Sequence, residues 1–348
     1  MLFFRQQIHI NLSNHILHAC AIIVFICAHT DLYDNVVIHS YIRRLCTVVK
    51  DPKNRYIDEW VDYHFALGFS RIRIYDNTEN FTLEDWGRHK SYSSQVDRIH
   101  YLPGITHDVS THAKCGNKFH SPALMECAQF AKLENISWVS GLDVDEFLVI
   151  REPSLSVVDF MEQYCKYPCG QLSLNWLLFG PSGRREYKPV PVTKRFIHRL
   201  LEKHELLEKR FSSLVKGIAD PNAIDFVDGF WMHTWIIDNT RTWLDTSGTR
   251  QKADKRQKWW LWMMMNAAQP TDAGAIHHYK TLSEGEWHEK NCARGHWADV
   301  DVSRDCERNA SALFEDSDTV IDETVWERLK LLVPEYSIFD NLTKAELG

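Results

Sequence analysis

Residues 136–150 read ISWVSGLDVDEFLVI, an apolar run that is interrupted by three acidic side chains and then resumes. The first part, 136–142, is short and apolar, which predicts a buried strand. In open α/β sheets the ligand site lies just beyond the carboxyl ends of the strands. The segment therefore predicts an α/β fold and places a candidate site at Asp143, Asp145 and Glu146.

The spacing of the acids adds a chemical expectation. Alternate residues of an extended chain face the same side, so Asp143 and Asp145 point together while Val144 turns inward. Two such carboxylates can share one hard cation, and without a cation their repulsion would raise the pKa of one of them. A lone D-x-D also occurs in ordinary turns, but the apolar flanks favour a position inside the fold. We assign Asp143 and Asp145 as metal ligands and all three acids, with Glu146, as candidate catalytic residues.

The residues before this segment alternate between short apolar runs and amphipathic stretches. We expect a strand at 45–49, a helix at 56–67 that ends at Gly68, and a second strand at 71–75. This order is typical of βαβ units around a mostly parallel sheet. The loop between the first strand and the helix reads KDPKN and lacks the glycine-rich phosphate-binding patterns. Nicotinamide-dependent dehydrogenases and P-loop nucleoside triphosphatases are therefore disfavoured.

Several motifs occur in one order along the chain. They are KDPKN at 50–54, EWVDYH at 59–64, IYDN at 74–77, DVDEF at 143–147, WLLFG at 176–180 with Ser182 and Gly183, Lys216, Met232-His233, His278-Tyr279 and KNCARG at 290–295. The ordered set, over residues 45–297, resembles glycosyltransferase family 92, formerly called domain of unknown function 23. One departure is Lys50-Asp51-Pro52, where the family usually has K-N-E.

The resemblance implies a fold and an activity. The expected fold is of the GT-A type, with a mostly parallel central sheet flanked by helices. The expected reaction moves a sugar from a nucleotide-sugar donor, such as a UDP-sugar, to a glycan acceptor. A divalent cation, usually Mn²⁺, is held by the D-x-D acids against the departing diphosphate. Characterised members of the family are inverting galactosyltransferases, so galactose is the leading expectation for the sugar.

Further metal and phosphate ligands are expected late in the chain. By resemblance, a histidine completes the metal shell, and we rank His278 first and His233 second, although a lone histidine is more often structural. Lys290 and Arg294 are four residues apart and share one face if the segment is helical. They are candidates to bind the diphosphate, and the alternative is a solvated helix face.

The remaining site residues concern the nucleoside, the acceptor and the base. Lys50 and Asp76 are candidate donor-binding residues, but Asp76-Asn77 is also a typical turn. By resemblance, Asp143 is a donor-binding candidate as well, facing the ribose or a metal-bound water. Trp176 and Phe179 are candidates to stack on an acceptor sugar, with core packing as the alternative. An inverting transfer needs a carboxylate base, for which the sequence leaves three candidates open: Glu186, Asp225 and Asp228.

Two other functions compete with this interpretation. The same acids could serve a metal-dependent phosphoesterase or nucleotidyltransferase, although such enzymes usually carry further acids for a second cation. The fold could also be a catalytically silent carbohydrate-binding module. Sequence-independent binding of nucleic acid is disfavoured, because 40 basic against 47 acidic side chains give a net charge of −7.

The predicted organisation has three parts. Residues 1–40 form an N-terminal extension whose apolar run, 16–28, is a signal peptide, a short membrane anchor or a buried element, since a span needs about 20 apolar residues. Association with a membrane through this run is therefore an open expectation. Residues 41–300 form the glycosyltransferase domain, and 301–348 form a C-terminal helical extension.

Cysteines and N-glycosylation sequons indicate the cellular compartment in which the chain folds. The nine cysteines show no C-x-x-C spacing, and we interpret them as buried reduced thiols, with some disulfide bridges as the alternative in a secreted chain. N-glycosylation sequons begin at Asn11, Asn80, Asn135, Asn309 and Asn341, of which Asn135 is expected to be buried. The sequons favour the secretory pathway, in the Golgi membrane or lumen, with the cytoplasm as the alternative.

Overall fold

The computed structural model describes residues 43–51, 53, 55–102, 120–200, 214–226, 230–231, 233–251, 270–290 and 320–348. The predicted extension at 1–40, with its apolar run, lies outside the described residues. All described residues belong to one unit, Tyr41–Gly348. Within them, no helix combines the length and the hydropathy that crossing a bilayer requires.

The first elements follow the predicted order. Strand β1 (Arg43–Val49) is followed by helix α2 (Ile57–Leu67) and strand β2 (Arg71–Asp76), within about two residues of the expected bounds. Gly68 ends α2 at a φ of 115°, a left-handed conformation that glycine adopts without strain. A 3₁₀ turn (Ser93–Gln95) then leads into β3 (Val96–His100).

The middle of the chain carries the acidic segment. Helix α3 (His120–Leu133) precedes β4 (Trp138–Gly141), and β5 (Glu146–Ile150) begins at the last of the three acids. Helix α4 (Val157–Tyr164) and the long strand β6 (Cys169–Leu178) follow. The predicted strand at 136–142 is thus confirmed, although it is shorter than expected.

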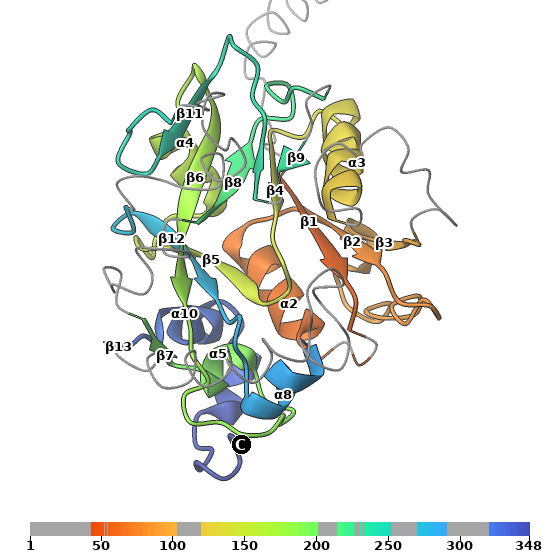
Figure 1. Cartoon of the computed structure of the whole chain (residues 1–348), viewed down its shortest axis with the longest axis vertical. Coiled ribbons are helices and arrows are strands. Elements are labelled where there is room, and N and C mark those ends of the chain that lie inside the picture. The colour runs from red at the N-terminus through yellow and green to blue at the C-terminus, as the bar shows by residue number, and fades with distance from the viewer. Residues whose placement is uncertain are drawn as a thin grey trace, which may run out of the picture. The chain divides into compact units, whose positions relative to one another are not determined.

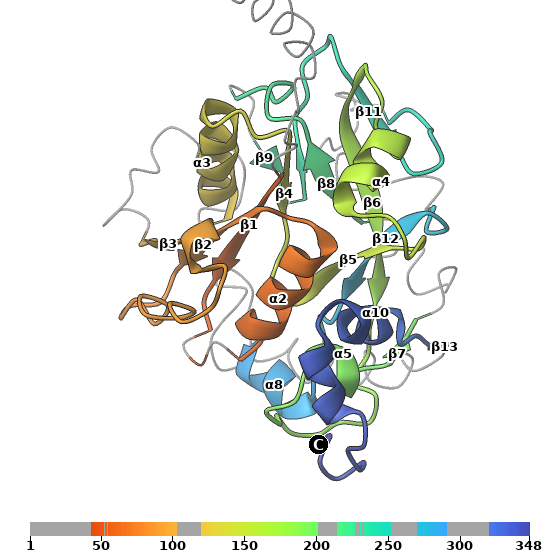
Figure 2. The same cartoon turned by 180° about the vertical axis from the view of Figure 1, so that it is seen from behind.

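The later elements are shorter. They are α5 (Val192–Arg195), β7 (His198–Arg199), β8 (Val215–Ala219), β9 (Phe230–Trp231), β10 (Thr234–Trp235), β11 (Thr242–Asp245), β12 (Gly274–His278), α8 (Glu284–His288), β13 (Val320–Ile321), α10 (Thr324–Leu332) and a 3₁₀ turn (Pro334–Phe339). Figures 1 and 2 both show α5, α8 and α10 grouped at one end of the molecule. Helix α10 packs against α2, α5 and β5, so this C-terminal helix shares the core of the sheet.

One mixed sheet organises the described residues. Its strands run in the order β3-β2-β1-β4-β8-β6-β12-β5, with β11 also paired to β6. The pairs β3–β2, β2–β1 and β1–β4 are parallel. The pairs of β6 with β11 and with β12 are parallel as well. Strand β8 lies antiparallel between β4 and β6, and β5 is antiparallel to β12. The expected α/β fold with a mostly parallel sheet is confirmed at this level.

The two faces of the sheet bury separate apolar clusters. Leu45 and Val49 of β1 join the cluster that α2, α4 and α10 cover. Cys46 and Val48 of the same strand point to the other face and pack under α3. This alternation follows from the two-residue period of a strand. Helices therefore cover both faces, which leaves the strand ends as the place for a site.

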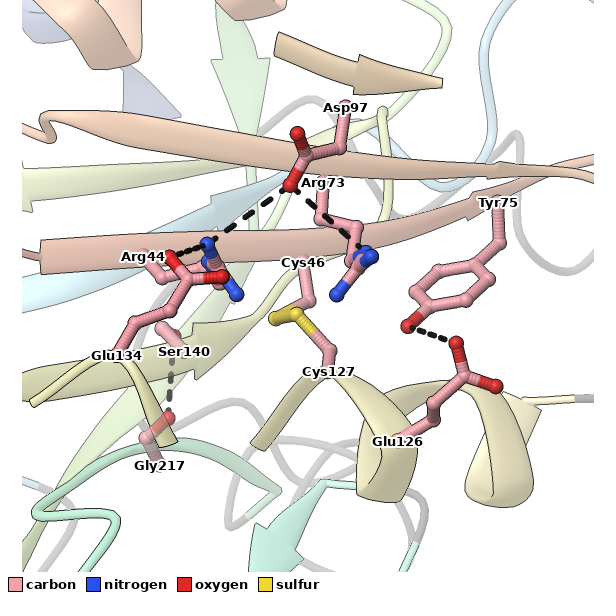
Figure 3. The surroundings of a disulfide bond; sticks show 10 residues. All are labelled: Arg44, Cys46, Arg73, Tyr75, Asp97, Glu126, Cys127, Glu134, Ser140 and Gly217. Carbon is pink, nitrogen blue, oxygen red and sulfur yellow. Dashed lines mark hydrogen bonds and ion pairs between the residues drawn. A yellow bond between two sulfur atoms is a disulfide. The ribbon is translucent and has the colours of Figure 1, made fainter. Parts of the chain in front are cut away.

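Two disulfides tie the elements together. Cys46 of β1 is bonded to Cys127 of α3, and Cys165 is bonded to Cys169 between α4 and β6. Figure 3 shows the first bond between strand and helix, beside the buried Arg44, whose guanidinium contacts Glu134 at 2.6 Å. These four are all the cysteines of the described ranges. Our interpretation of the cysteines as reduced thiols is therefore wrong for these four. No local spacing predicts the first bond, because its two cysteines are 81 residues apart in the chain and meet only in the folded sheet.

Asn135 corrects a second expectation. It lies in the turn between α3 and β4, its side chain is exposed, and its φ of 54° is the left-handed conformation that asparagine tolerates. The following apolar run starts only at Ile136, which is buried. The prediction that Asn135 is buried was therefore wrong by one residue.

Candidate functional site

The carboxyl ends of the parallel strands form the edge where the acidic segment lies. Val49 of β1 pairs with Asp76 of β2, and Cys46 pairs with Gly141, the last residue of β4. Because β1, β2 and β4 are parallel, they end at the same edge of the sheet. Lys50, Asp76 and Asp143 each lie at or just beyond the end of one of these strands.

The turn that carries the acids is held by its own hydrogen bonds. Glu146 donates its backbone N–H to the carbonyl oxygen of Asp143 at 2.9 Å, and its Oε2 accepts the backbone N–H of Asp143 at 2.9 Å. Tyr279 donates its backbone N–H to the carbonyl oxygen of Asp145 at 2.8 Å. Val144 packs against the core, as expected, but residues 144–145 form a turn and not the extended chain on which that expectation rested. The turn is thus fixed both internally and from β12.

Lysines compensate the carboxyl groups of the turn, of which Asp145 and Glu146 are buried and Asp143 is partly exposed. Lys216 of β8 places its Nζ 3.3 Å from Asp143 Oδ2 and 2.9 Å from Glu146 Oε2. Lys290 places its Nζ 2.5 Å from Asp145 Oδ2. His120, the first residue of α3, approaches Asp143 with Nδ1 at 3.8 Å from Oδ1. Positive charges therefore face each member of the acid pair.

These contacts shift the pKa values of the three acids in different directions. Burial by itself would raise the pKa of Asp143, but the Lys216 ammonium outweighs it and holds that pKa well below its ordinary value. Burial is likewise outweighed by Lys290 at Asp145, whose pKa is lowered. For Glu146, burial prevails over Lys216 and raises the pKa to about 8. The two aspartates are therefore carboxylates at neutral pH, the form that a cation requires.

His278 is the histidine that the fold brings to the acids. It ends β12, with Nε2 at 3.6 Å from Asp145 Oδ1 and Nδ1 at 3.8 Å from Glu146 Oε1. Burial lowers the pKa of His278 to about 3, so its ring is neutral, as in a metal ligand. The ring of His233 lies 4.7 Å from the ring of Trp176, and its Nδ1 is 3.0 Å from the carbonyl oxygen of Val215.

Asp145 and His278 present one possible pair of ligands for a divalent cation. Asp145 Oδ1 and His278 Nε2 face each other at 3.6 Å, close to the separation of two ligands on one ion. Carboxylate oxygen and imidazole nitrogen both suit Mn²⁺. In the described part of the chain, no three or more His, Cys, Asp or Glu side chains are arranged to hold a metal. Asp145 and His278 would supply two ligands, and a cation bound there would need its other ligands from water or phosphate.

The predicted donor-binding residues fall into three situations. Lys50 is exposed beyond β1. Asp76 is fully buried, and both of its oxygens accept hydrogen bonds from its own loop, at 2.8 Å from the backbone N–H groups of Thr78 and Leu83. This geometry favours the turn-forming alternative for Asp76. Arg294 lies outside the described residues.

The predicted acceptor residues differ from each other. Phe179 is 1% exposed and packs on the rings of His277 and Tyr279, so the structure favours core packing over a sugar contact. Trp176 is buried too, but its ring lies 4.3 Å from the ring of His278, beside the acids. It therefore bounds the site, and a rearrangement would be needed to expose its face to a sugar.

The three base candidates come from separate segments of the chain. Glu186 is exposed in the loop before α5, and Asp225 donates its backbone N–H to the carbonyl oxygen of Ile236. Asp228 lies outside the described residues. The base is left open.

Sequence reasoning missed two side chains of the site. His120 was not considered, and Lys216 served only as one motif of a resemblance. Each comes from an element far from the acids in the chain, and a single lysine or histidine has no local pattern that marks it. The signal that could have found Lys216 is a charged residue in the middle of an otherwise apolar strand, VKGIA at 215–219.

Comparisons with known proteins cover much of the chain. A family model described as glycosyltransferase family 92 matches residues 45–307. A glycosyltransferase family 92 protein from Oryza sativa subsp. japonica is 27% identical over 188 residues, which is 53% of this chain and 29% of the relative. Another, from Ricinus communis, is 26% identical over 177 residues, which is 50% of this chain and 28% of the relative. The matches thus span less than a third of either relative.

Proposed function

Since the chain belongs to glycosyltransferase family 92, we propose that it transfers a sugar from a nucleotide-sugar donor to a glycan acceptor at the Asp143–Glu146 turn, with a divalent cation as cofactor. The observation that carries this proposal is Asp145 Oδ1 facing His278 Nε2 at 3.6 Å, beside a second ionised aspartate at the end of a parallel strand. A phosphate-bearing donor and its cation are the ligands that such an edge suits.

Each residue of the site would have its own role in binding the cation and the donor. Asp145 and His278 would hold the cation, with Asp143 next to it. A bound Mn²⁺ supplies Lewis-acid stabilisation of the diphosphate leaving group. Lys216 keeps Asp143 and Glu146 in place through its ion pair with Asp143 and its contact with Glu146 Oε2. Lys290 carries a positive charge at the same point and would face the donor phosphates.

Finer details of the proposal come from the family resemblance. They are a GT-A type of fold, a UDP-sugar donor, galactose as the sugar and inversion at the anomeric carbon. The parallel order β3-β2-β1-β4 followed by the antiparallel β8 supports a nucleotide-binding sheet of this type. Membrane association through residues 16–28 stays a prediction.

The experiment that tests the proposal is a donor screen. The purified chain is incubated with Mn²⁺, a panel of nucleotide sugars and a mixture of oligosaccharides, and release of the nucleoside diphosphate is measured. Asp145→Asn is expected to lower turnover at least about 100-fold, because it removes a charged ligand at the leaving group. Asp272→Asn, an exposed change at the opposite end of β12, serves as the matched control and is expected to keep full turnover.

The same screen separates the rivals. A transferase releases nucleoside diphosphate faster when the correct acceptor is present. A phosphoesterase or nucleotidyltransferase would release inorganic phosphate or nucleoside monophosphate without an acceptor. A silent binding module would bind the donor but release nothing. Loss of turnover in the control variant as well would contradict the assignment of Asp145.

We also propose that the chain folds in the oxidising lumen of the secretory pathway, such as the Golgi. Two disulfides support this, because such bonds rarely persist in the cytosol. Asn80, Asn135 and Asn341 are exposed and begin sequons. Expression in a eukaryotic cell should therefore give a chain whose apparent mass falls on N-glycosidase treatment. A chain with no glycan and free Cys46 and Cys127 would contradict the proposal.

A further inference from the structure

The feature of interest is the contact between Lys290 and Asp145. Asp145 is 5% exposed, and a carboxylate removed from water in this way needs a partner of opposite charge. Lys290 provides it, with Nζ at 2.5 Å from Oδ2. The other oxygen, Oδ1, faces His278. The carboxylate that the proposed function assigns to a cation is thus already engaged by a side chain of the protein.

The two lysines of the site are held differently. Lys216 is 3% exposed, projects from the centre of the sheet and contacts Asp143 and Glu146 together. Lys290 lies beyond the end of α8, its side chain is 32% exposed, and Asp145 is its one ion-pair partner within the described residues. Lys290 therefore has room to leave its carboxylate, whereas Lys216 does not.

A cation and an ammonium compete for the same charge. A divalent ion on Asp145 would lie within a few ångströms of Lys290 Nζ, and the two positive charges would repel each other strongly in a partly buried site. The repulsion is relieved if the ammonium turns to an anion that arrives with the ion. The diphosphate of a nucleotide sugar is such an anion.

We propose that Lys290 is the resident counter-ion of Asp145, and that its displacement couples metal binding to nucleotide binding. The inference rests on the proposed function. Without nucleotide, Lys290 opposes the metal; with nucleotide, its ammonium binds the diphosphate and the opposition becomes an attraction. Metal and nucleotide therefore strengthen each other's binding, and by linkage the effect is reciprocal.

Two calorimetric titrations of the full chain test this. The first adds Mn²⁺ alone, and the second adds UDP at saturating Mn²⁺. Lys290→Met is expected to bind Mn²⁺ alone at least about tenfold more tightly, because the competing charge is gone. The same variant is expected to bind UDP about tenfold more weakly, because one charged phosphate contact is lost. Effects of opposite sign in one variant are the signature, since a general loss of structure would weaken both.

Two further variants complete the design. Lys290→Arg keeps the charge and should behave like the natural chain in both titrations. Lys53→Met removes an exposed lysine that pairs with Glu289, next to Lys290 in the chain, and should change neither affinity by more than about twofold. A thermal unfolding curve of each variant confirms that it is folded.

The outcomes distinguish the two claims. If the natural chain binds neither Mn²⁺ nor UDP with Mn²⁺, the proposed function fails and the inference fails with it. If the natural chain binds both ligands but Lys290→Met binds Mn²⁺ alone no more tightly, the counter-ion role is refuted and the proposed function stands. If both affinities fall together, Lys290 is merely a binding or structural residue.

Discussion

Lys216 is the residue on which the geometry of the acids depends most. Its ammonium is buried between Asp143 and Glu146, two carboxyl groups of the same turn. Removing one partner of a buried ion pair costs more than the pair contributes, because the remaining charge stays unpaired. Lys216 is therefore a positioning residue that acts through the acids.

Lys216→Met is expected to lower the free energy of unfolding by about 3 kcal/mol, since it leaves the Asp143 carboxylate without its main cation and Glu146 Oε2 without a hydrogen-bond donor. Denaturant unfolding measures the change. Lys166→Met, an exposed lysine before β6, is the control and should change stability by less than about 0.5 kcal/mol. Equal stability of both variants would mean that the Lys216 contacts contribute nothing to the turn.

At the scale of single residues, the sequence predicts the acids and His278 but not their partners. The D-x-D segment is local, so its position at a strand end can be predicted from hydrophobic pattern alone. His278 was ranked first from a motif, and the fold places it 3.6 Å from Asp145. Lys216 of β8 and His120 of α3 come from other elements, and no local pattern links them to the acids. Asp76 is hydrogen-bonded within its own turn, which the sequence leaves as one of two alternatives.

At the scale of elements, β1 and α3 are joined by the bond between Cys46 and Cys127. The two cysteines are 81 residues apart in the chain, whereas Cys165 and Cys169 are four apart. In the chain-entropy account, a disulfide stabilises by restricting the unfolded chain, and more so for a longer loop. The two disulfides should therefore contribute different amounts to the free energy of unfolding.

Replacing Cys46 and Cys127 by alanine should lower the unfolding free energy by about 4 kcal/mol, and replacing Cys165 and Cys169 by about 2 kcal/mol. The difference reflects loop length, and the second pair serves as the control for loss of any disulfide. Denaturant unfolding under non-reducing conditions gives both values. A larger effect for the short loop would contradict this account.

Elements with a regular spacing of apolar residues were predicted well, whereas the short strands late in the chain were not. Helix α2 shows apolar residues at three- and four-residue spacing and ends at a glycine, so both its type and its end were expected. Strands β8 to β11 have two to five residues each and gain their stability from pairing in the sheet. Pairing of that kind is a long-range property, and a short apolar run does not specify it.

At the scale of the whole molecule, the sheet order assembles the site. The acids follow β4, Lys216 comes from β8, His278 from β12 and Lys290 from the end of α8. Strands β4 and β8 are neighbours, and β12 pairs with β5, which begins at the last acid. The topology therefore brings segments up to 145 residues apart to one edge, while family membership says what chemistry to expect there.

The central claim is that the Asp143–Glu146 turn, with His278, holds a divalent cation against a nucleoside diphosphate. The most direct test is calorimetric titration of the natural chain with UDP, in the presence of Mn²⁺ and in the presence of a chelator. The account predicts binding that is at least about 100-fold tighter with Mn²⁺. UDP binding of equal strength in both conditions, or no binding in either, would contradict it.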